Sequence, residues 1–346
     1  PSRGLGDVYK RQIRKLAEEG SEPFHTGHIA KEMVRASEAA YGPFTSADFS
    51  GHQTEVYQPI STTYRGIEVF ETAPPSQGLI VLEWLNLLEG DDLRAMGFES
   101  AATIHLLIET KKLAFADRVA HCGVTRSTPK VVDILLSKDY AKNLCQLITM
   151  DRAMARLPVP GETSHADTVY LTVVDEDQNA ISFINSIFHS FGSGLLDAQT
   201  GVLFNNRGAS FVIDPLHPNC IAPKKRPMHT IIPGMVKKNG RSVMPFGVVG
   251  GHYQPVGHAH FITNILDYGM DVQEALDAPR AFAFAEQLQV ERGLKTKVVE
   301  GLQALGHDVV EAGTALGGGQ AIQMNWDTGV LTGGSDPRKD GCAIGY

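Results

Sequence analysis

The chain has 346 residues, of which 20% are charged and 42% hydrophobic, a composition typical of globular proteins. Its 39 acidic and 31 basic residues give a net charge of −8. This acidic balance, without a cluster of Lys and Arg, argues against a nucleic-acid partner. No apolar run approaches the roughly 20 residues that span a bilayer, and four widely spaced cysteines fit neither a disulfide framework nor a zinc ribbon.

Residues 1–12 look like a translated sequencing adapter, so we expect them to be an artefact and exclude them from the fold prediction. The alternative is a short polar N-terminal tail. No signal peptide is visible, and the sequence leaves the cellular compartment open.

The first half of the chain shows mostly helical periodicity. Thr26 is the expected N-cap of one helix. A short strand around residues 67–69 should end at the prolines 74–75, after which Gly78 opens an apolar helix. Ser100 is the expected N-cap of a longer helix.

The second half is expected to be β-rich, after a connector at 153–167 whose two prolines and glycine predict an exposed, flexible segment. Residues 168–174 and 180–187, joined by the turn 175–179, predict a hairpin. Further strands are expected at 201–204, 230–236, 243–249, 321–326 and 330–332, and helices at 255–268, 272–278 and 294–305. Helices before and between many strands predict a layered α+β domain, with both halves contributing to one core.

The junction between connector and strand suits a self-cleavage site. If the Asp167–Thr168 bond is cut, Thr168 becomes a new N-terminus with both a hydroxyl and a free α-amine. A Thr hydroxyl is a weak nucleophile that needs an adjacent base. An α-amine titrates at about 7.7–8.0 in model peptides, so it can accept that proton. Taken alone, however, a Thr at this place more often simply opens and pairs a strand.

A series of motifs follows in a fixed order. Thr168 lies seven residues before Asp175, which begins the turn DEDQN, where Gln178 stands in place of the glycine of a D-x-D-G-N pattern. With the motifs around it, this segment resembles the gamma-glutamyltransferase family of N-terminal nucleophile hydrolases. The other motifs are YRG at 64–66, PPSQG at 74–78, FGSG at 191–194, a V-L-x-N-N segment at 202–206, KRP at 225–227, GG at 250–251, DYG…ALDAPR at 267–280 and GGSDPR at 333–338. The resemblance covers nearly everything from residue 13 to residue 346.

The resemblance implies a fold and a division of the chain. The fold would be an α+β four-layer α-β-β-α sandwich, truncated at its N-terminus. Residues 13–167 would be the C-terminal part of a large chain and 168–346 the small catalytic chain. Together they would form one domain.

The resemblance also implies catalytic roles. Thr168 would be the nucleophile, and Ser186 aligns with a family Thr whose hydroxyl supports it. Gly250 and Gly251 match paired glycines whose backbone N–H groups form the oxyanion hole. Glycine suits that role because a backbone amide can approach the oxyanion with no Cβ in the way. Outside this context, the ordinary interpretation of two glycines is a turn at a strand end.

The implied substrate pocket departs from the family pattern. Family members hold the α-amino group of a gamma-glutamyl substrate with an Asn, a Gln and an Asp, where this chain has Phe188, Arg207 and Ser210. Two adjacent serines that hold the carboxylate correspond here to His229 and Thr230. A buried ammonium without a charged partner is costly, whereas an Arg can bind a carboxylate through two parallel hydrogen bonds. Arg207 could equally form a structural salt bridge.

Other candidate signals are weaker. His252, His258 and His260 could suggest a metal-dependent amidohydrolase, but no acidic ligand lies at a characteristic spacing, so we expect no metal and no cofactor. Cys220 has no base at readable spacing and is expected to be an inert thiol. The segment DPRKDG at 336–341 is expected to be a turn.

The sequence therefore predicts a self-processing Thr-dependent gamma-glutamyl hydrolase or transferase that acts through an acyl-enzyme. Its substrate would be glutathione or another small amide, and its large and small chains would come from one precursor. One alternative is an amidohydrolase or acylase for carboxylate-bearing amides of the glutaryl or oxamate type. A second alternative is an uncut, non-catalytic relic.

Overall fold

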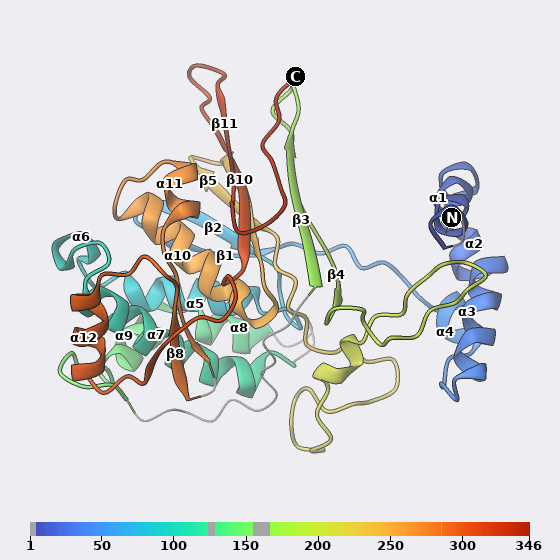
Figure 1. Cartoon of the computed structure of the whole chain (residues 1–346), viewed down its shortest axis with the longest axis horizontal. Coiled ribbons are helices and arrows are strands. Elements are labelled where there is room, and N and C mark those ends of the chain that lie inside the picture. Colours follow the sequence, from blue (N-terminus) through green and yellow to red (C-terminus); the bar gives the residue numbers. More distant parts are fainter. Residues whose placement is uncertain (1–4, 124–128, 155–166, 285) are drawn as a thin grey trace. The chain divides into compact units, whose positions relative to one another are not determined.

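The computed structural model describes residues 5–123, 129–154, 167–284 and 286–346 (Figure 1). The chain divides into two compact units. The first consists of Pro1–Gln58 and Ile187–Arg207, and the second of Pro59–Ser186 and Gly208–Tyr346. Residues 155–166, which include most of the expected connector, lie outside the described residues.

The first unit is helical and has its own small core, formed by Ile29, Met33 and Phe204. The expected N-cap at Thr26 is wrong: Thr26 ends one helix, and Gly27 caps the next. A Cβ on Gly27 would lie 2.7 Å from the Cα of Pro23, so the tight approach of the two helices requires glycine there. Its helices are α1 (Leu5–Glu19), α2 (Glu22–His25), α3 (His28–Ala39) and α4 (Ser46–Ser50).

The strand expected at 201–204 is also wrong, since this segment forms only an isolated bridge between Leu196 and Leu203. Gly201 has a φ of 70° and donates its N–H to the carbonyl of Asp197, which turns the chain back on itself. The Asp197 carboxylate accepts from the hydroxyl of Thr200 at 2.6 Å. Local turn chemistry therefore outweighs the β propensity of this segment.

A six-stranded antiparallel sheet forms the centre of the second unit, in the order β1-β2-β5-β6-β10-β11. Its strands are β1 (Ile60–Tyr64), β2 (Ile67–Glu71), β5 (Gly234–Lys238), β6 (Arg241–Val249), β10 (Gly318–Met324) and β11 (Leu331–Ser335). The strand expected at 230–236 begins later, at Gly234, because residues 229–231 bond instead to the segment around Ser76. Strand β1 was not among the predicted strands.

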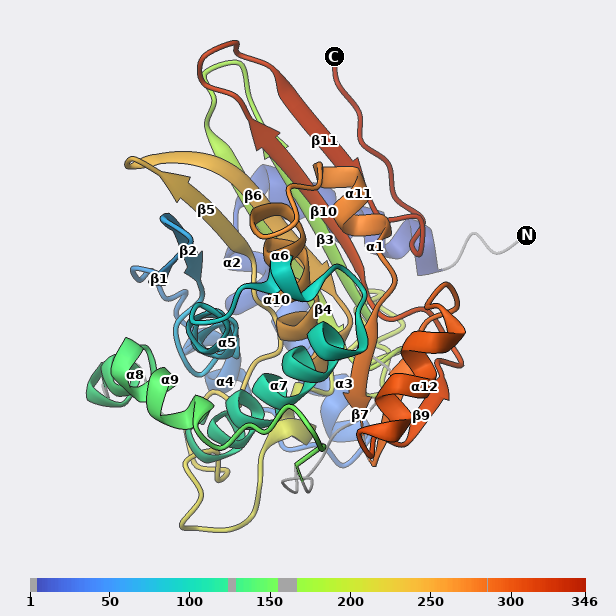
Figure 2. The ribbon, with the colours of Figure 1, turned by 90° about the vertical axis from the view of Figure 1, so that its left-hand side faces the viewer.

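Helices cover one face of this sheet, as Figure 2 shows from the helical side. Phe246 of β6 stacks on Phe261 of α10, and Val248 of the same strand lies against Gly257. All of α5 is buried, which explains its continuously apolar sequence. The expected helix start at Gly78 and the expected N-cap at Ser100 are confirmed. The main covering helices are α5 (Gly78–Leu88), α7 (Ala101–His121), α10 (Gln254–Leu266) and α11 (Val272–Asp277).

The hairpin of β3 (Asp167–Val174) and β4 (Ala180–Phe188) packs on the opposite face. A Cβ on Gly247 would lie 2.4 Å from the ring of Tyr170, so that ring rests directly on the strand backbone. The Ser182 hydroxyl donates to the carbonyl of Phe246 at 3.1 Å. Helices, six-stranded sheet and hairpin thus follow one another as three of the four expected layers, and the predicted α+β class is confirmed.

A smaller β element completes the second unit. Three strands, β7 (Ala281–Phe284), β8 (Gln287–Val290) and β9 (Val309–Glu311), form a separate sheet, and α12 (Thr296–Ala304) packs with them against α7. The expected helices at 255–268, 272–278 and 294–305 are present within two residues of their predicted bounds. The remaining short helices are α6 (Leu93–Met96), α8 (Pro129–Leu135) and α9 (Lys138–Cys145), together with single turns at Arg207–Ser210 and Gly251–Tyr253.

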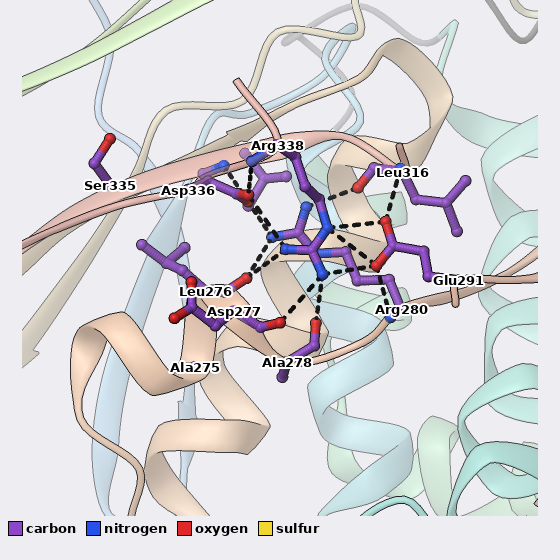
Figure 3. Close-up of polar contacts among 12 residues, drawn as sticks. Ala275, Leu276, Asp277, Ala278, Arg280, Glu291, Leu316, Ser335, Asp336 and Arg338 are labelled. Carbon is purple, nitrogen blue, oxygen red and sulfur yellow. Dashed lines mark hydrogen bonds and ion pairs between the residues drawn. The ribbon is translucent and has the colours of Figure 1, made fainter. Parts of the chain in front are cut away.

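The motifs ALDAPR and GGSDPR meet in a buried network of charges (Figure 3). Arg280 forms an ion pair with the carboxylate of Asp336, which also accepts from the N–H of Gly319 at 2.9 Å. Arg338 binds Glu291 through two nitrogens, with Nε at 2.9 Å and Nη2 at 2.7 Å. The segment at 336–341 therefore anchors the end of β11 to α11 and β8. Among the described residues, no helix is long and apolar enough to cross a membrane.

Candidate active site

Thr168 and Ser186 face each other across the hairpin. Asp175 and Asn179 close the turn through a hydrogen bond from the Asp175 N–H to the Asn179 carbonyl at 3.1 Å, and Thr168 and Ser186 each lie seven residues further along their strands. Directly opposed residues of an antiparallel pair lie close enough for their side chains to interact. The Thr168 hydroxyl donates to the Ser186 hydroxyl at 3.1 Å, and both residues are partly buried.

The turn at 175–179 sets this register. The Asp175 carboxylate accepts from the backbone N–H and the side-chain amide of Asn179, at 2.8 and 2.9 Å, and these bonds lower its pKa. Gln178 has a φ of 62°, in the left-handed region that favours glycine. This φ explains why the family pattern has a glycine at this position, since glycine adopts such an angle without strain. In this chain Gln178 adopts the same angle, and the turn is kept.

The inner face of β3 lies on the strand that leads to the two glycines. Side chains alternate along a strand, so Thr168 and Tyr170 point to the same face. Tyr170 rests on Gly247, and Gly250 follows three residues later, about 10 Å along an extended chain. The hydroxyl of Tyr170 contacts that of Ser182 at 2.8 Å, which ties the two strands together on this face.

Gly250 and Gly251 form the turn between β6 and α10. Their φ angles are 133° and 58°, and a Cβ on Gly250 would lie 3.1 Å from the Cα of Gly317. Tyr253 donates its N–H to the Gly250 carbonyl at 3.0 Å, which fixes the peptide that carries the Gly251 N–H. Within the part of the chain that the structure describes, the N–H groups of both glycines donate no hydrogen bond to protein. Two fixed backbone donors of this kind suit an oxyanion.

Phe188 and Arg207 lie together in the first unit. The Arg207 guanidinium lies 5.0 Å from the centre of the Phe188 ring, and Arg207 is only 6% exposed. Burial lowers the pKa of Arg207 to about 10, which leaves it charged near neutral pH. Phe188 has a φ of 79°, a strained value for a bulky residue of the kind often found at functional sites.

Ser210, His229 and Thr230 lie in the second unit. The Ser210 hydroxyl donates to the Met228 carbonyl at 2.9 Å. The His229 backbone runs beside residues 75–77: its N–H donates to the Pro75 carbonyl at 2.9 Å, and its carbonyl accepts from the Gln77 N–H at 3.0 Å. Thr230 is fully buried.

A buried network behind the glycines was not anticipated from the sequence. The side-chain nitrogen of Gln77 donates to the carbonyls of Thr230 and Gly251, both at 2.9 Å. Arg118 contacts the side-chain oxygen of Gln77 at 3.3 Å and Nδ1 of His252 at 2.7 Å. The PPSQG motif was the available signal, but nothing in its spacing indicates contacts with residues more than 150 positions away.

The histidines of the GHAH segment have structural surroundings. His258 contacts Glu71 through Nδ1 at 2.6 Å and accepts the Val248 N–H through Nε2 at 3.0 Å. Burial lowers the pKa of His260 to about 3, so this ring is neutral. Cys220 is partly buried, and its thiol lies against the carbonyl of Ile221.

One set of metal-type side chains occurs elsewhere among the described residues. Ligand atoms of His105, Glu109 and His307 lie within 4.8 Å of one another. The two His rings are hydrogen-bonded to each other at 2.8 Å, and the Glu109 oxygens bind Lys112 and the N–H of Met154, each at 2.7 Å. These contacts already occupy the ligand atoms of the cluster.

Comparisons with known proteins agree with this architecture. The family model for gamma-glutamyltranspeptidase matches residues 7–346. The glutathione hydrolase-like YwrD proenzyme of Bacillus subtilis (strain 168) is 36% identical over 96% of this chain and 64% of its own length. The oxamate amidohydrolase proenzyme of Klebsiella pneumoniae subsp. pneumoniae is 34% identical over 96% of this chain and 64% of its own length.

The crystal structure of cephalosporin acylase from Bacillus halodurans superposes with a TM-score of 0.89 and 36% sequence identity, covering 98% of this chain and 63% of that one. The chain thus spans less than two thirds of the length of each of these relatives. The N-terminal nucleophile hydrolase fold expected from the motifs is confirmed. The chain belongs to the gamma-glutamyltranspeptidase family.

Proposed function

We propose that the chain carries the catalytic part of a self-processing hydrolase or acyltransferase that acts on gamma-glutamyl amides such as glutathione. The observation that carries the proposal is the hydrogen bond of 3.1 Å from the Thr168 hydroxyl to the Ser186 hydroxyl, near the start of β3. It is supported by the glycine pair with two available backbone donors at the end of the neighbouring strand β6. The names of two relatives, both described as proenzymes, agree with self-processing.

In the proposed processing step, the Thr168 hydroxyl attacks the Asp167 carbonyl and the peptide nitrogen leaves as the Thr168 α-amine. The resulting ester is hydrolysed by water, which gives an Asp167 carboxylate and restores the Thr168 hydroxyl. Residues 13–167 and 168–346 then become two chains of one enzyme. Ser186 accepts the hydrogen bond of the Thr168 hydroxyl and so orients its oxygen.

In the proposed catalytic step, the Thr168 α-amine takes the proton of its own hydroxyl while the oxygen attacks the substrate amide. The N–H groups of Gly250 and Gly251 stabilise the tetrahedral oxyanion. The proton passes to the leaving amine as the C–N bond breaks, which leaves an acyl ester on Thr168. Water or an acceptor amine then attacks the ester and frees the enzyme.

The test follows the precursor by intact mass on long incubation. We expect the unmodified chain to yield a fragment beginning at Thr168 and the Thr168→Ala variant to remain whole. Thr172→Ala is the matched control, because Thr172 is another β3 hydroxyl, bonded instead to the Ile181 carbonyl at 2.8 Å. We expect this control to be cut at the normal rate. A precursor that hydrolyses amides while uncut would overturn the mechanism, and one that is neither cut nor active would support the non-catalytic relic.

A second candidate function is hydrolysis of an amide whose acyl part bears a carboxylate but no α-amine. The observation that favours it is the pair of replacements at 207 and 210, where a buried Arg207 is present and a Ser replaces the acid expected to bind an ammonium. The oxamate amidohydrolase and cephalosporin acylase relatives are in keeping with it. Rates on gamma-glutamyl and glutaryl p-nitroanilide decide between the two, since turnover of the glutaryl compound alone would retire the first candidate.

A further inference from the structure

The PPSQG segment at 74–78 lies against the residues that precede β5. The backbones of Ser76 and His229 form a parallel bridge, and the Ser76 hydroxyl donates to the Ile231 carbonyl at 2.7 Å. A Cβ on Gly78 would lie 2.5 Å from the Thr72 carbonyl oxygen, so the chain can enter α5 this closely only with glycine. The segment 229–231 is therefore held by backbone and side-chain bonds from one short motif.

Gln77 extends this contact to the glycine turn. Its side chain is fully buried, and one nitrogen, Nε2, donates to the Thr230 carbonyl and to the Gly251 carbonyl at 2.9 Å each. The NH₂ group has two hydrogens, so a single side chain satisfies both acceptors. Gln77 thus joins the segment proposed to bind the acyl end of the substrate to the turn proposed to bind the oxyanion.

The orientation of the Gln77 amide follows from its surroundings. Arg118 can only donate hydrogen bonds, and it contacts Oε1 of Gln77 at 3.3 Å. The two groups next to Nε2 are carbonyl oxygens, which can only accept. A flipped amide would leave three unfavourable contacts, so the assignment does not rest on the coordinates of N and O alone.

Arg118 closes the network into a ring. The same guanidinium nitrogen lies 2.7 Å from Nδ1 of His252, the residue directly after Gly251. Arg118, Gln77, Gly251 and His252 are thereby linked in a closed buried circuit. Such a circuit holds the peptide that follows Gly251, while the Tyr253 N–H holds the peptide that precedes it.

We propose that Gln77 is a positioning residue, which fixes the glycine turn and residues 229–231 relative to each other for attack at the substrate carbonyl. The expected effect of Gln77 on the reaction rate rests on the proposed function, whereas its expected effect on the structure of the two segments does not. Gln77 does not touch the reacting atoms, so its loss should weaken transition-state binding more than substrate binding.

The test variant is Gln77→Met, made in the complete precursor, which keeps an unbranched side chain of similar size but removes both donors. Asn86→Leu is the matched control. Asn86 is another buried amide on the adjoining helix α5, which donates to the Leu136 carbonyl at 2.9 Å, away from the glycine turn. If Gln77→Met does not fold, Gln77→Asn replaces it, because the side chain shorter by one methylene cannot reach both carbonyls.

Kinetics are measured on whichever of the two p-nitroanilides the unmodified enzyme hydrolyses faster. We expect Gln77→Met to lower kcat about 10- to 100-fold with KM within about twofold, because small misplacement of a catalytic donor acts on the transition state. Asn86→Leu should keep kcat within about threefold at a comparable loss of stability. An equal fall of kcat in both variants would mean a general stability effect and would overturn the inference.

Hydrogen–deuterium exchange supplies a readout that does not depend on activity. We expect faster exchange in Gln77→Met for peptides covering 228–232 and 248–254, and no change there in Asn86→Leu. Unchanged exchange at both segments in Gln77→Met would overturn the inference even if the enzyme is active. An unmodified enzyme that hydrolyses neither anilide would count against the proposed function, and the exchange result would still decide the role of Gln77.

Discussion

Gln178 has a left-handed backbone in the turn that aligns Thr168 with Ser186. A side chain at such a φ costs about 1–2 kcal/mol, whereas glycine adopts it freely at some cost in unfolded-chain entropy. We therefore expect Gln178→Gly to raise the free energy of unfolding by about 0.5–1 kcal/mol, measured by denaturant titration.

Glu176→Gly provides the control for this prediction. Glu176 belongs to the same turn but is not among the residues with positive φ, so glycine there only adds freedom to the unfolded chain. We expect it to lower the free energy of unfolding. Equal shifts of either sign in the two variants would show that the backbone angle is not the cause.

The candidate site was predictable from sequence wherever its geometry is local. The hairpin that brings Thr168 and Ser186 together was recognisable from its turn, whereas the roles of Ser186 and of the glycine pair came only from the resemblance to the family. Gln77 was not predictable, because its partners Thr230 and Gly251 come near it only once the sheet has formed. Its amide looks in the sequence like any polar residue before a helix.

At the scale of elements, the same division between local and distant information appears. The hairpin and the long helices α5, α7 and α10 were recognisable from patterning within each segment. The strands β7 and β8 have four residues each and β9 has three, and β8 pairs with β9 across an intervening helix. Such short strands carry too few residues to show alternation, and the β8–β9 pairing joins segments that α12 separates in the sequence.

The contact between His105 of α7 and His307, which follows α12, predicts a pH dependence of stability. Burial, then Lys112, then His105 lower the pKa of His307 to about 4 from its ordinary 6.5. The folded state therefore binds fewer protons than the unfolded state between these values, so stability falls as the pH drops from 6.5 towards 4. From pH 7 to pH 5 we expect His307 to account for a loss of roughly 1–2 kcal/mol.

His307→Gln tests this expectation through the change of the free energy of unfolding with pH rather than through its absolute value. The variant lacks the titrating ring, so its free energy of unfolding should change less between pH 7 and pH 5 than that of the unmodified chain. The measurement is denaturant unfolding at both values. Parallel pH profiles would show that His307 keeps an ordinary affinity for protons in the folded state.

At the scale of the whole molecule, the outward face of the β3–β4 hairpin is apolar. Leu171 lies opposite Phe183, and Val173 opposite Ile181, by the register that places Thr168 opposite Ser186. These side chains are between 42% and 56% exposed, and Val169 is 65% exposed. Contiguous apolar surface on a β hairpin favours association with other chains.

We therefore expect the 346-residue chain to self-associate, and the double variant Leu171→Thr/Phe183→Thr to do so at least several-fold less, by sedimentation velocity. Threonine keeps the β propensity of these positions while removing apolar surface. The control is Ile213→Thr/Leu216→Thr, two residues that are each 92% exposed outside the hairpin. An equal fall in self-association in the control variant would mean that exposed apolar side chains in general, not this face, drive association.

The alternation of side chains along β3 also limits how the enzyme can mature. Thr168 and the exposed Val169 belong to opposite faces of the strand, and a cut displaced by a single peptide bond would begin the new chain with Asp167 or Val169, neither of which has a hydroxyl. On the proposed mechanism, a chain that another protease has cut at a neighbouring bond is inactive rather than partly active. Maturation is then all-or-none, and only a break at one bond produces a working enzyme.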